Sequence, residues 1–187
     1  MLQRERPASP SLHLRHDRYG RPLLYQDHEP SAIAVALSHS RAIAACAITD
    51  LGAIGIDVEF CANRPFEAIA AAAFGPAEQE LVARDGLAAF YRIWTLREAL
   101  AKAWPDDIAW LADGHDYFAG AARDGSWSAV IDQQAWMFWT GVIQSGFAFA
   151  VALAPRTPIP PRDTIALAAE PFACQAAIDG SPDGWII

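Results

Sequence analysis

The sequence predicts an α+β fold in which helices pack on one face of an antiparallel sheet. Apolar residues make up 53% of the 187 residues, which is enough for a sizeable core. Runs rich in β-branched and aromatic residues, separated by turn residues, occur before residue 61 and again after residue 126. Between them lies an alanine-rich region, and alanine has the highest helical propensity.

The first group of strand-like runs leads up to residue 60. In order they are Leu23–Tyr25, Ile33–Ser38, Ala42–Thr49 and Ala53–Phe60. Tyr19–Pro22 is typical of a turn that leads into the first run. Asp50–Gly52 is a turn signal between the last two runs, so we expect residues 42–60 to form a hairpin.

The middle of the chain predicts three helices, at Phe66–Phe74, Ala77–Arg84 and Trp94–Trp104. Gly75-Pro76 separates the first two, because proline is tolerated at the start of a helix but not inside it. Pro105 is expected to end the third.

A second group of strands follows at Trp127–Ile131, Trp136–Ile143 and Phe147–Leu153. Residues 133–155 carry no charge and are long enough to cross a bilayer. The polar turn signal Gln144–Gly146 interrupts them, and this favours a buried hairpin over a membrane span.

We expect three segments along the chain: a flexible segment at 1–18, one domain at 19–154, and a Pro-rich connection with a C-terminal tail at 155–187. The formal net charge of −8 argues against a general nucleic-acid binder and against attraction to anionic membranes. The three cysteines, Cys46, Cys61 and Cys174, form no CxxC pair, and no apolar signal-peptide core precedes them. A reduced, cytoplasmic setting is therefore expected.

Gly55–Glu59 is the sharpest local motif. Residues two apart in a strand point to the same face, so Asp57 and Glu59 project together while Ile56 and Val58 face the core. Two adjacent carboxylates repel each other unless a cation lies between them, and a hard ion such as Mg²⁺ prefers oxygen ligands. A half-buried edge strand with its polar face in water explains the same pattern.

Glu98 and Lys102 are four residues apart and so share one helical face. A structural explanation is available here too, because Thr95 and Glu98 match a capping box and Glu98 with Lys102 matches a surface ion pair. Composition favours a functional role, since Lys102 is the one lysine among fourteen basic residues. A lysine ammonium suits phosphate contact or proton transfer, and a guanidinium does not replace it freely.

Ser38-His39-Ser40 ends a strand just before Arg41. The hydroxyls, the imidazole and the guanidinium together are compatible with an anion site, although a single histidine is more often structural.

These motifs together resemble the paired signature of the phosphopantetheinyl transferase superfamily, and in particular its Sfp-type class. Gly55–Glu59 (GIDVE) and Trp94–Ala103 (WTLREALAKA) carry the resemblance. The flanking motifs fit as well: Tyr19–Pro22 and Leu37–Ser40 lie upstream, and Phe74–Glu78 lies between the two.

The resemblance implies Mg²⁺-dependent transfer of the 4′-phosphopantetheine group from coenzyme A to a serine of an acyl or peptidyl carrier protein, releasing adenosine 3′,5′-bisphosphate. The enzyme would be a holo-[acyl-carrier-protein] synthase or a related 4′-phosphopantetheinyl transferase, serving fatty-acid, polyketide or nonribosomal peptide synthesis. The residue roles implied are metal ligation by Asp57, Glu59 and Glu98, catalysis by Glu78 as base and by Lys102, and coenzyme A binding by Arg21, Ser38, His39, Arg97 and Lys102.

The chain also departs from this class, because only 37 residues precede Ser38 and most of the family's N-terminal half is missing. Either a homo-oligomer compensates for the short half, or the chain is a truncated product. Two alternatives stay open: a catalytically degenerate homologue that binds coenzyme A or a carrier protein, and a different magnesium-dependent enzyme that uses the same acids.

Overall fold

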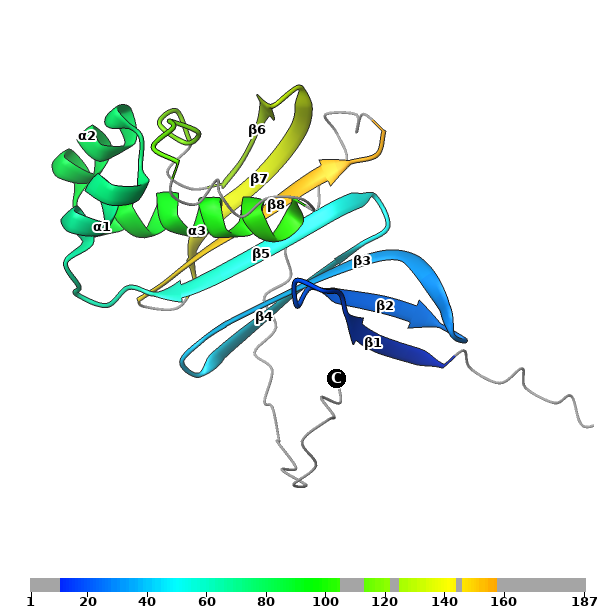
Figure 1. Ribbon diagram of the computed structural model, residues 1–187. Helices are drawn as coiled ribbons and strands as arrows, with labels where there is room; N and C mark the ends of the chain where they lie inside the picture. Colours follow the sequence, from blue (N-terminus) through cyan, green and yellow to red (C-terminus); the bar gives the residue numbers. More distant parts are fainter. Residues whose placement is uncertain (1–10, 105–112, 122–124, 144–145, 158–187) are drawn as a thin grey trace, which may run out of the picture.

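The computed structural model describes residues 11–104, 113–121, 125–143 and 146–157. These residues form two four-stranded antiparallel sheets and three helices (Figure 1). The α+β class is confirmed, but the expected strands divide between two sheets. The expected helix stop at Pro105 and the tail beyond residue 157 lie outside the described residues.

Sheet A contains the first four strands in the order β1-β2-β3-β4. They are β1 (Leu12–His16), β2 (Pro22–Gln26), β3 (Glu29–Ser40) and β4 (Ile43–Thr49). Residues 12–16 of the segment that we expected to be flexible therefore form a strand, which pairs antiparallel with β2.

Sheet B contains the other four strands in the order β5-β8-β7-β6. They are β5 (Gly52–Phe60), β6 (Gly125–Ile131), β7 (Gln134–Ile143) and β8 (Phe147–Pro155). β7 and β8 pair antiparallel, so the hairpin predicted for the uncharged stretch is confirmed. No helix among the described residues is long and apolar enough to cross a membrane.

The hairpin expected over residues 42–60 is wrong. β4 pairs with β3, and β5 pairs with β8 in the other sheet. The chain changes sheets at Asp50–Gly52, where Gly52 passes so close to β8 that a Cβ would clash with the carbonyl of Ala154. The turn signal was correct, but β5 finds its partner about one hundred residues later in the chain rather than in its neighbour β4.

The three helices are α1 (Phe66–Ala73), α2 (Pro76–Asp85) and α3 (Leu87–Ala103). α3 begins seven residues before the expected start at Trp94, because Gly86, with φ at +66°, ends α2 and lets the next helix begin at once. Thr95 thus lies inside α3, where its hydroxyl donates to the carbonyl of Tyr91. The expected capping box at Thr95 and Glu98 is wrong.

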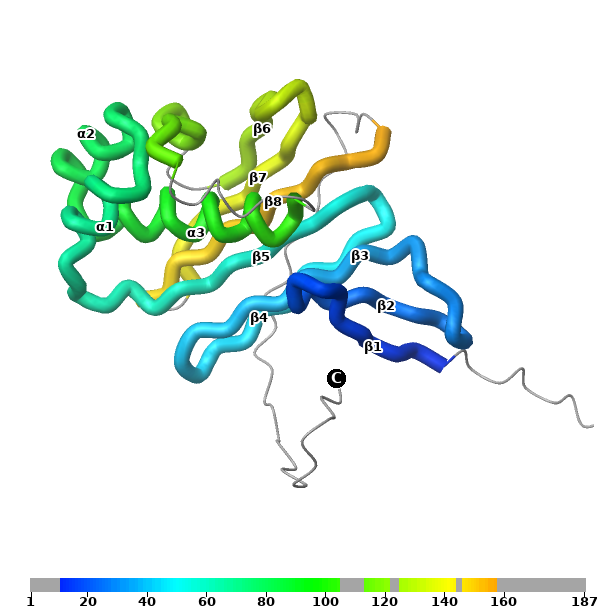
Figure 2. Tube along the Cα trace, viewed as in Figure 1, coloured from blue at the N-terminus to red at the C-terminus, as the bar shows by residue number. Residues whose placement is uncertain are grey.

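Sheet B is the central layer of the molecule. Its strands alternate, so Ala148, Ala150 and Ala152 of β8 belong to the core beneath α3, whereas Val151 and Leu153 point to the other side. On that other side, Ala36 of sheet A packs against sheet B. Figure 2 shows the resulting order of layers: helices, then sheet B, then sheet A.

Candidate active site at the β5–α3 contact

Asp57 and Glu59 lie on the face of β5 that α3 covers. Gly55 is on the same face, and a Cβ there would clash with the backbone carbonyl of Ala99 in α3. The missing side chain therefore lets the helix approach the strand directly. This close approach brings Glu98 and Lys102 of α3 over the two carboxylates of β5.

Lys102 bonds directly to the first of these carboxylates. Its Nζ lies 2.6 Å from Asp57 Oδ1 and 3.1 Å from Ser38 Oγ. The Asp57 side chain is only 5% exposed, whereas that of Lys102 is 32% exposed. The ammonium group therefore supplies positive charge to a buried carboxylate while it remains accessible from solvent.

Glu98 belongs to the same electrostatic cluster. Its burial raises its pKa, the charges of Asp57 and Glu59 raise it further, and the charge of Lys102 lowers it. These effects require the three carboxylates to lie within range of one another. The three acids that the sequence predicted as metal ligands therefore lie within electrostatic range of one another.

Asp57 also provides a test of whether the site suits a cation. Its Oδ2 is buried and has no hydrogen-bond partner among the described residues, which is costly for a carboxylate oxygen. Over the described residues, no three carboxylate, imidazole or thiol groups meet as a complete metal site. The acids nevertheless fit a hard cation, because they are all oxygen donors and one of their buried oxygens lacks a partner.

Arg21 lies at the end of α3, close to this cluster. Its Nη1 lies 3.3 Å from the carbonyl of Trp104, two residues after Lys102, and Asp17 holds its guanidinium at 2.6 Å. His39 lies elsewhere: it is exposed and separates Ser38 and Ser40 in β3, so it points to the opposite face of that strand. Of the residues predicted to bind coenzyme A, Ser38 and Lys102 contact Asp57, whereas Arg21 contacts the carbonyl of Trp104 and His39 points away from the acids.

Glu78 and Arg97 form a buried ion pair. Arg97 Nη2 lies 2.7 Å from Glu78 Oε2, and the side chains are 1% and 0% exposed. Glu78 Oε1 accepts the backbone N–H groups of Tyr117 and Phe118 at 3.0 and 2.7 Å. In this arrangement neither side chain reaches solvent, so their predicted roles as base and as coenzyme A ligand stay predictions.

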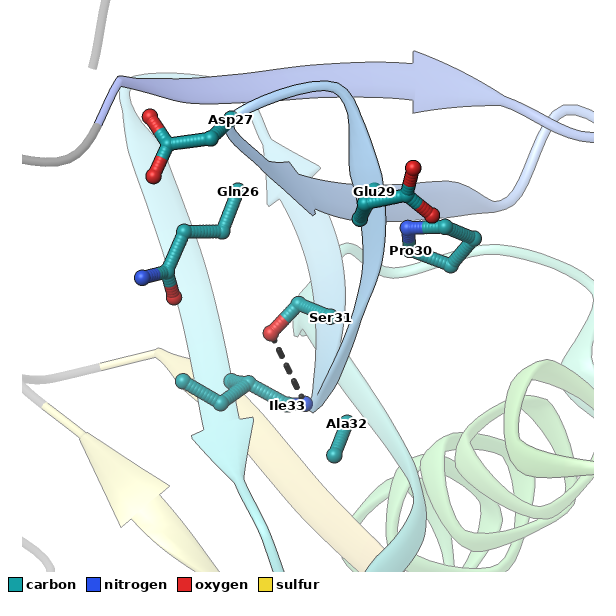
Figure 3. Close-up of a pocket in the computed structure, with 7 residues that line it drawn as sticks. All are labelled: Gln26, Asp27, Glu29, Pro30, Ser31, Ala32 and Ile33. Atoms are coloured by element: carbon teal, nitrogen blue, oxygen red, sulfur yellow. Dashed lines mark hydrogen bonds between the residues drawn. The ribbon is translucent and has the colours of Figure 1, made fainter.

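A pocket of about 570 Å³ lies at the β2–β3 turn, and Figure 3 shows the residues that line it. It is lined by Gln26, Asp27 and residues 29–33, and none of these belongs to the carboxylate cluster. The candidate site is defined by converging charges and not by this pocket.

Comparison with known proteins fits this geometry. The model of the 4′-phosphopantetheinyl transferase superfamily matches residues 53–152, which run from the start of β5 into β8. The chain belongs to this superfamily. It is also 35% identical over 105 residues to the 4′-phosphopantetheinyl transferase HetI of Nostoc sp. (strain PCC 7120 / SAG 25.82 / UTEX 2576). That match covers 52% of this chain and 44% of HetI, so the chain spans less than half the length of this relative in the matched region.

The transferase superfamily match contains every predicted metal ligand, whereas Arg21 and Ser38–Ser40 lie before it. The sequence made the Ser40 hydroxyl compatible with an anion site, whereas in the structure this hydroxyl lies 3.1 Å from the carboxylate oxygen Oε2 of Glu59. The signal was present, since Ser38 and Ser40 are two residues apart in a strand and share a face. A contact between these serines and the carboxylates follows from this spacing only when β3 is known to run beside β5.

Proposed function

We propose that this chain transfers the 4′-phosphopantetheine group of coenzyme A to a serine of a carrier protein in a Mg²⁺-dependent reaction. The observation that carries the proposal is the buried Oδ2 of Asp57, which has no partner among the described residues. It belongs to a cluster with two further acids and the only lysine of the sequence. Such a cluster suits phosphoryl transfer, which needs positioning and charge neutralisation more than covalent help from the enzyme.

Asp57, Glu59 and Glu98 would hold the magnesium ion. When bound there, Mg²⁺ would neutralise the charge of the coenzyme A pyrophosphate. The like charges of the three acids favour a divalent cation. Burial raises the pKa of Glu98, and repulsion from Asp57 and Glu59 raises it further.

Lys102 would stabilise the leaving group, adenosine 3′,5′-bisphosphate. Its Nζ bonds to Asp57 at 2.6 Å but stays partly exposed, so it can also contact a phosphate that enters from solvent. The carrier serine Oγ forms a bond to the β-phosphorus while the bond to the oxygen of adenosine 3′,5′-bisphosphate breaks. Lys102 stabilises the charge that develops on that oxygen and can protonate it.

The serine proton needs an acceptor. Glu78 is the acceptor that the resemblance implies, and it would have to leave its pair with Arg97 to act. The carrier would be of the acyl or peptidyl type, the setting cytoplasmic, and the chain would act as a homo-oligomer.

The direct test is intact mass spectrometry of an apo carrier protein incubated with this chain, coenzyme A and Mg²⁺. We expect a gain of one phosphopantetheine arm that EDTA abolishes. Asp57→Asn should lower the rate by more than about 100-fold, because even changes next to metal ligands cost about 10- to 100-fold. Glu67→Gln, at an exposed acid in α1, is the matched control and should keep the rate of the parent chain.

A catalytically degenerate homologue is the second candidate, and the burial of Glu78 favours it. It predicts that the folded chain binds coenzyme A but never changes the mass of a carrier. Transfer by the parent chain would exclude this candidate. Transfer that is undiminished in Asp57→Asn would instead refute the proposed metal site.

A further inference from the structure

β5 lies at the edge of sheet B and pairs with a neighbouring strand on one side only. The N–H groups on its other side would need different partners, because an unpaired backbone group is costly when water is excluded. β3 of sheet A supplies them with side chains. Ser38 Oγ accepts the N–H of Val58 at 3.2 Å, and Ser40 Oγ accepts the N–H of Phe60 at 3.0 Å.

The same hydroxyls also bond to the carboxylates of β5. Ser38 Oγ donates to Asp57 Oδ1 at 2.9 Å, and Ser40 Oγ donates to Glu59 Oε2 at 3.1 Å. Each serine therefore binds the carboxylate of one residue and the backbone N–H of the next. A hydroxyl has one hydrogen to donate and two lone pairs to accept with, so both roles can be filled at once.

Ser38 and Ser40 make the same set of contacts at positions two residues apart. Ser38 and Ser40 are two residues apart in β3, as are Asp57 and Glu59 in β5. Each carboxylate is thus fixed through one oxygen, and Asp57 Oδ2 has no partner in the part of the chain that the structure describes. Fixing one oxygen of each group limits the rotation by which two like charges would move apart.

We infer that Ser38 and Ser40 are positioning residues that hold Asp57 and Glu59 in the orientation needed to bind a divalent cation. This inference rests on the proposed function, because it assigns the serines to the same cation site. It predicts a role for Ser40 that is distinct from any contact with coenzyme A, since its hydroxyl is already used by Glu59 and by the backbone of β5.

The test compares Ser40→Ala with Ser40→Thr, which keeps a hydroxyl and suits a strand. The probe is Mn²⁺ alone, and its binding to the full chain is followed by electron paramagnetic resonance without coenzyme A or carrier. We expect Ser40→Ala to weaken Mn²⁺ binding about 10-fold or more, as is typical when a group that orients a metal ligand is removed. Ser40→Thr should restore most of the affinity.

Ser31→Ala is the matched control, because Ser31 lies in the same strand but, over the described residues, its hydroxyl accepts only from the nearby N–H of Ile33. It should leave Mn²⁺ binding unchanged. Hydrogen exchange of the peptide that contains Val58 and Phe60 shows whether β5 stays paired in each variant. Unchanged Mn²⁺ affinity in Ser40→Ala would overturn the inference.

Two further outcomes separate this inference from the proposed function. Transfer by the parent chain with equal Mn²⁺ affinity in Ser40→Ala would leave the function standing and refute the role of the serine. A parent chain that binds no Mn²⁺ and transfers nothing would refute both the function and the inference. If hydrogen exchange of β5 were then faster in Ser40→Ala, the serine contacts would serve only to stabilise the β3–β5 contact.

Discussion

Sheets A and B each contain four antiparallel strands, yet they are packed differently. Sheet B has α3 on one face and Ala36 of sheet A on the other. Sheet A packs against sheet B with one face only. On its other face, Ile33, Leu37 and Ile48 are 37%, 41% and 64% exposed among the described residues. We call this the outer face of sheet A.

The two sheets therefore contribute differently, one mainly to the stability of the fold and the other to the position of the carboxylates. The helices and sheet B contain most of the large, fully buried side chains, including Tyr91, Phe90 and Arg97. Sheet A contributes fewer buried side chains, but its strand β3 supplies the hydroxyls that bond to Asp57 and Glu59. Changes on the helix side of sheet B should therefore affect folding most, and changes on the outer face of sheet A should affect it least.

The largest expected effect is at the buried ion pair of the helical layer. Glu78→Gln leaves the Arg97 guanidinium without its main counter-charge at a site that is 1% exposed. Removing one partner of a buried pair costs about 3–5 kcal/mol. We expect the value here at the lower end, because Asp113 also lies 3.6 Å from Arg97. Urea unfolding followed by circular dichroism measures it.

Glu80→Gln is the control for this prediction, since Glu80 lies in the same helix but is exposed. Its unfolding free energy should match that of the parent chain within about 0.5 kcal/mol. A stable Glu78→Gln that has lost transfer would contradict our prediction and support Glu78 as the base. A destabilised Glu78→Gln that still transfers when folded would show that the Glu78–Arg97 pair stabilises the fold and takes no part in transfer.

An intermediate effect is expected where α3 meets β5. Gly55→Ala places a Cβ against the carbonyl of Ala99, so the helix must shift. Overpacking of this kind costs about 1–3 kcal/mol, and it should also lower transfer because Glu98 and Lys102 move with the helix. Gly120→Ala, where a Cβ meets nothing within 4 Å, is the control and should be close to neutral in the same urea titration. Equal stability of the two variants would mean that the close packing of α3 on β5 is wrong.

Local patterns in the sequence predicted much of sheet B and of the acid cluster. Alternation along Gly55–Glu59 placed both carboxylates on one face, and the turn signal at 144–146 indicated the β7–β8 pairing. The division into two sheets was not predictable in this way. The strand after Asp50–Gly52 has the same local pattern whether it pairs with β4 or with β8, and only the tertiary fold decides between them.

The candidate site shows the same limit. A helical spacing of four placed Glu98 and Lys102 together, but no local pattern shows that Glu78 meets Arg97 and the backbone of Tyr117 inside the protein. The position of Gly86 was visible in the sequence, yet the expected start of α3 at Trp94 ignored it. Long-range partners, rather than residue types, therefore account for most of the errors.

The smallest effect is expected on the outer face of sheet A. Ile48→Thr keeps a β-branched side chain at a position that is 64% exposed, so the unfolding free energy should change by no more than about 0.5 kcal/mol. Ile56→Thr makes the same chemical change in β5 at 7% exposure, where burying the hydroxyl should cost about 1–3 kcal/mol. Urea titrations of both variants measure the difference between the two sheets directly. If Ile48→Thr lowered the unfolding free energy as much as Ile56→Thr, the outer face of sheet A would be covered in solution. The two sheets would then not differ in packing.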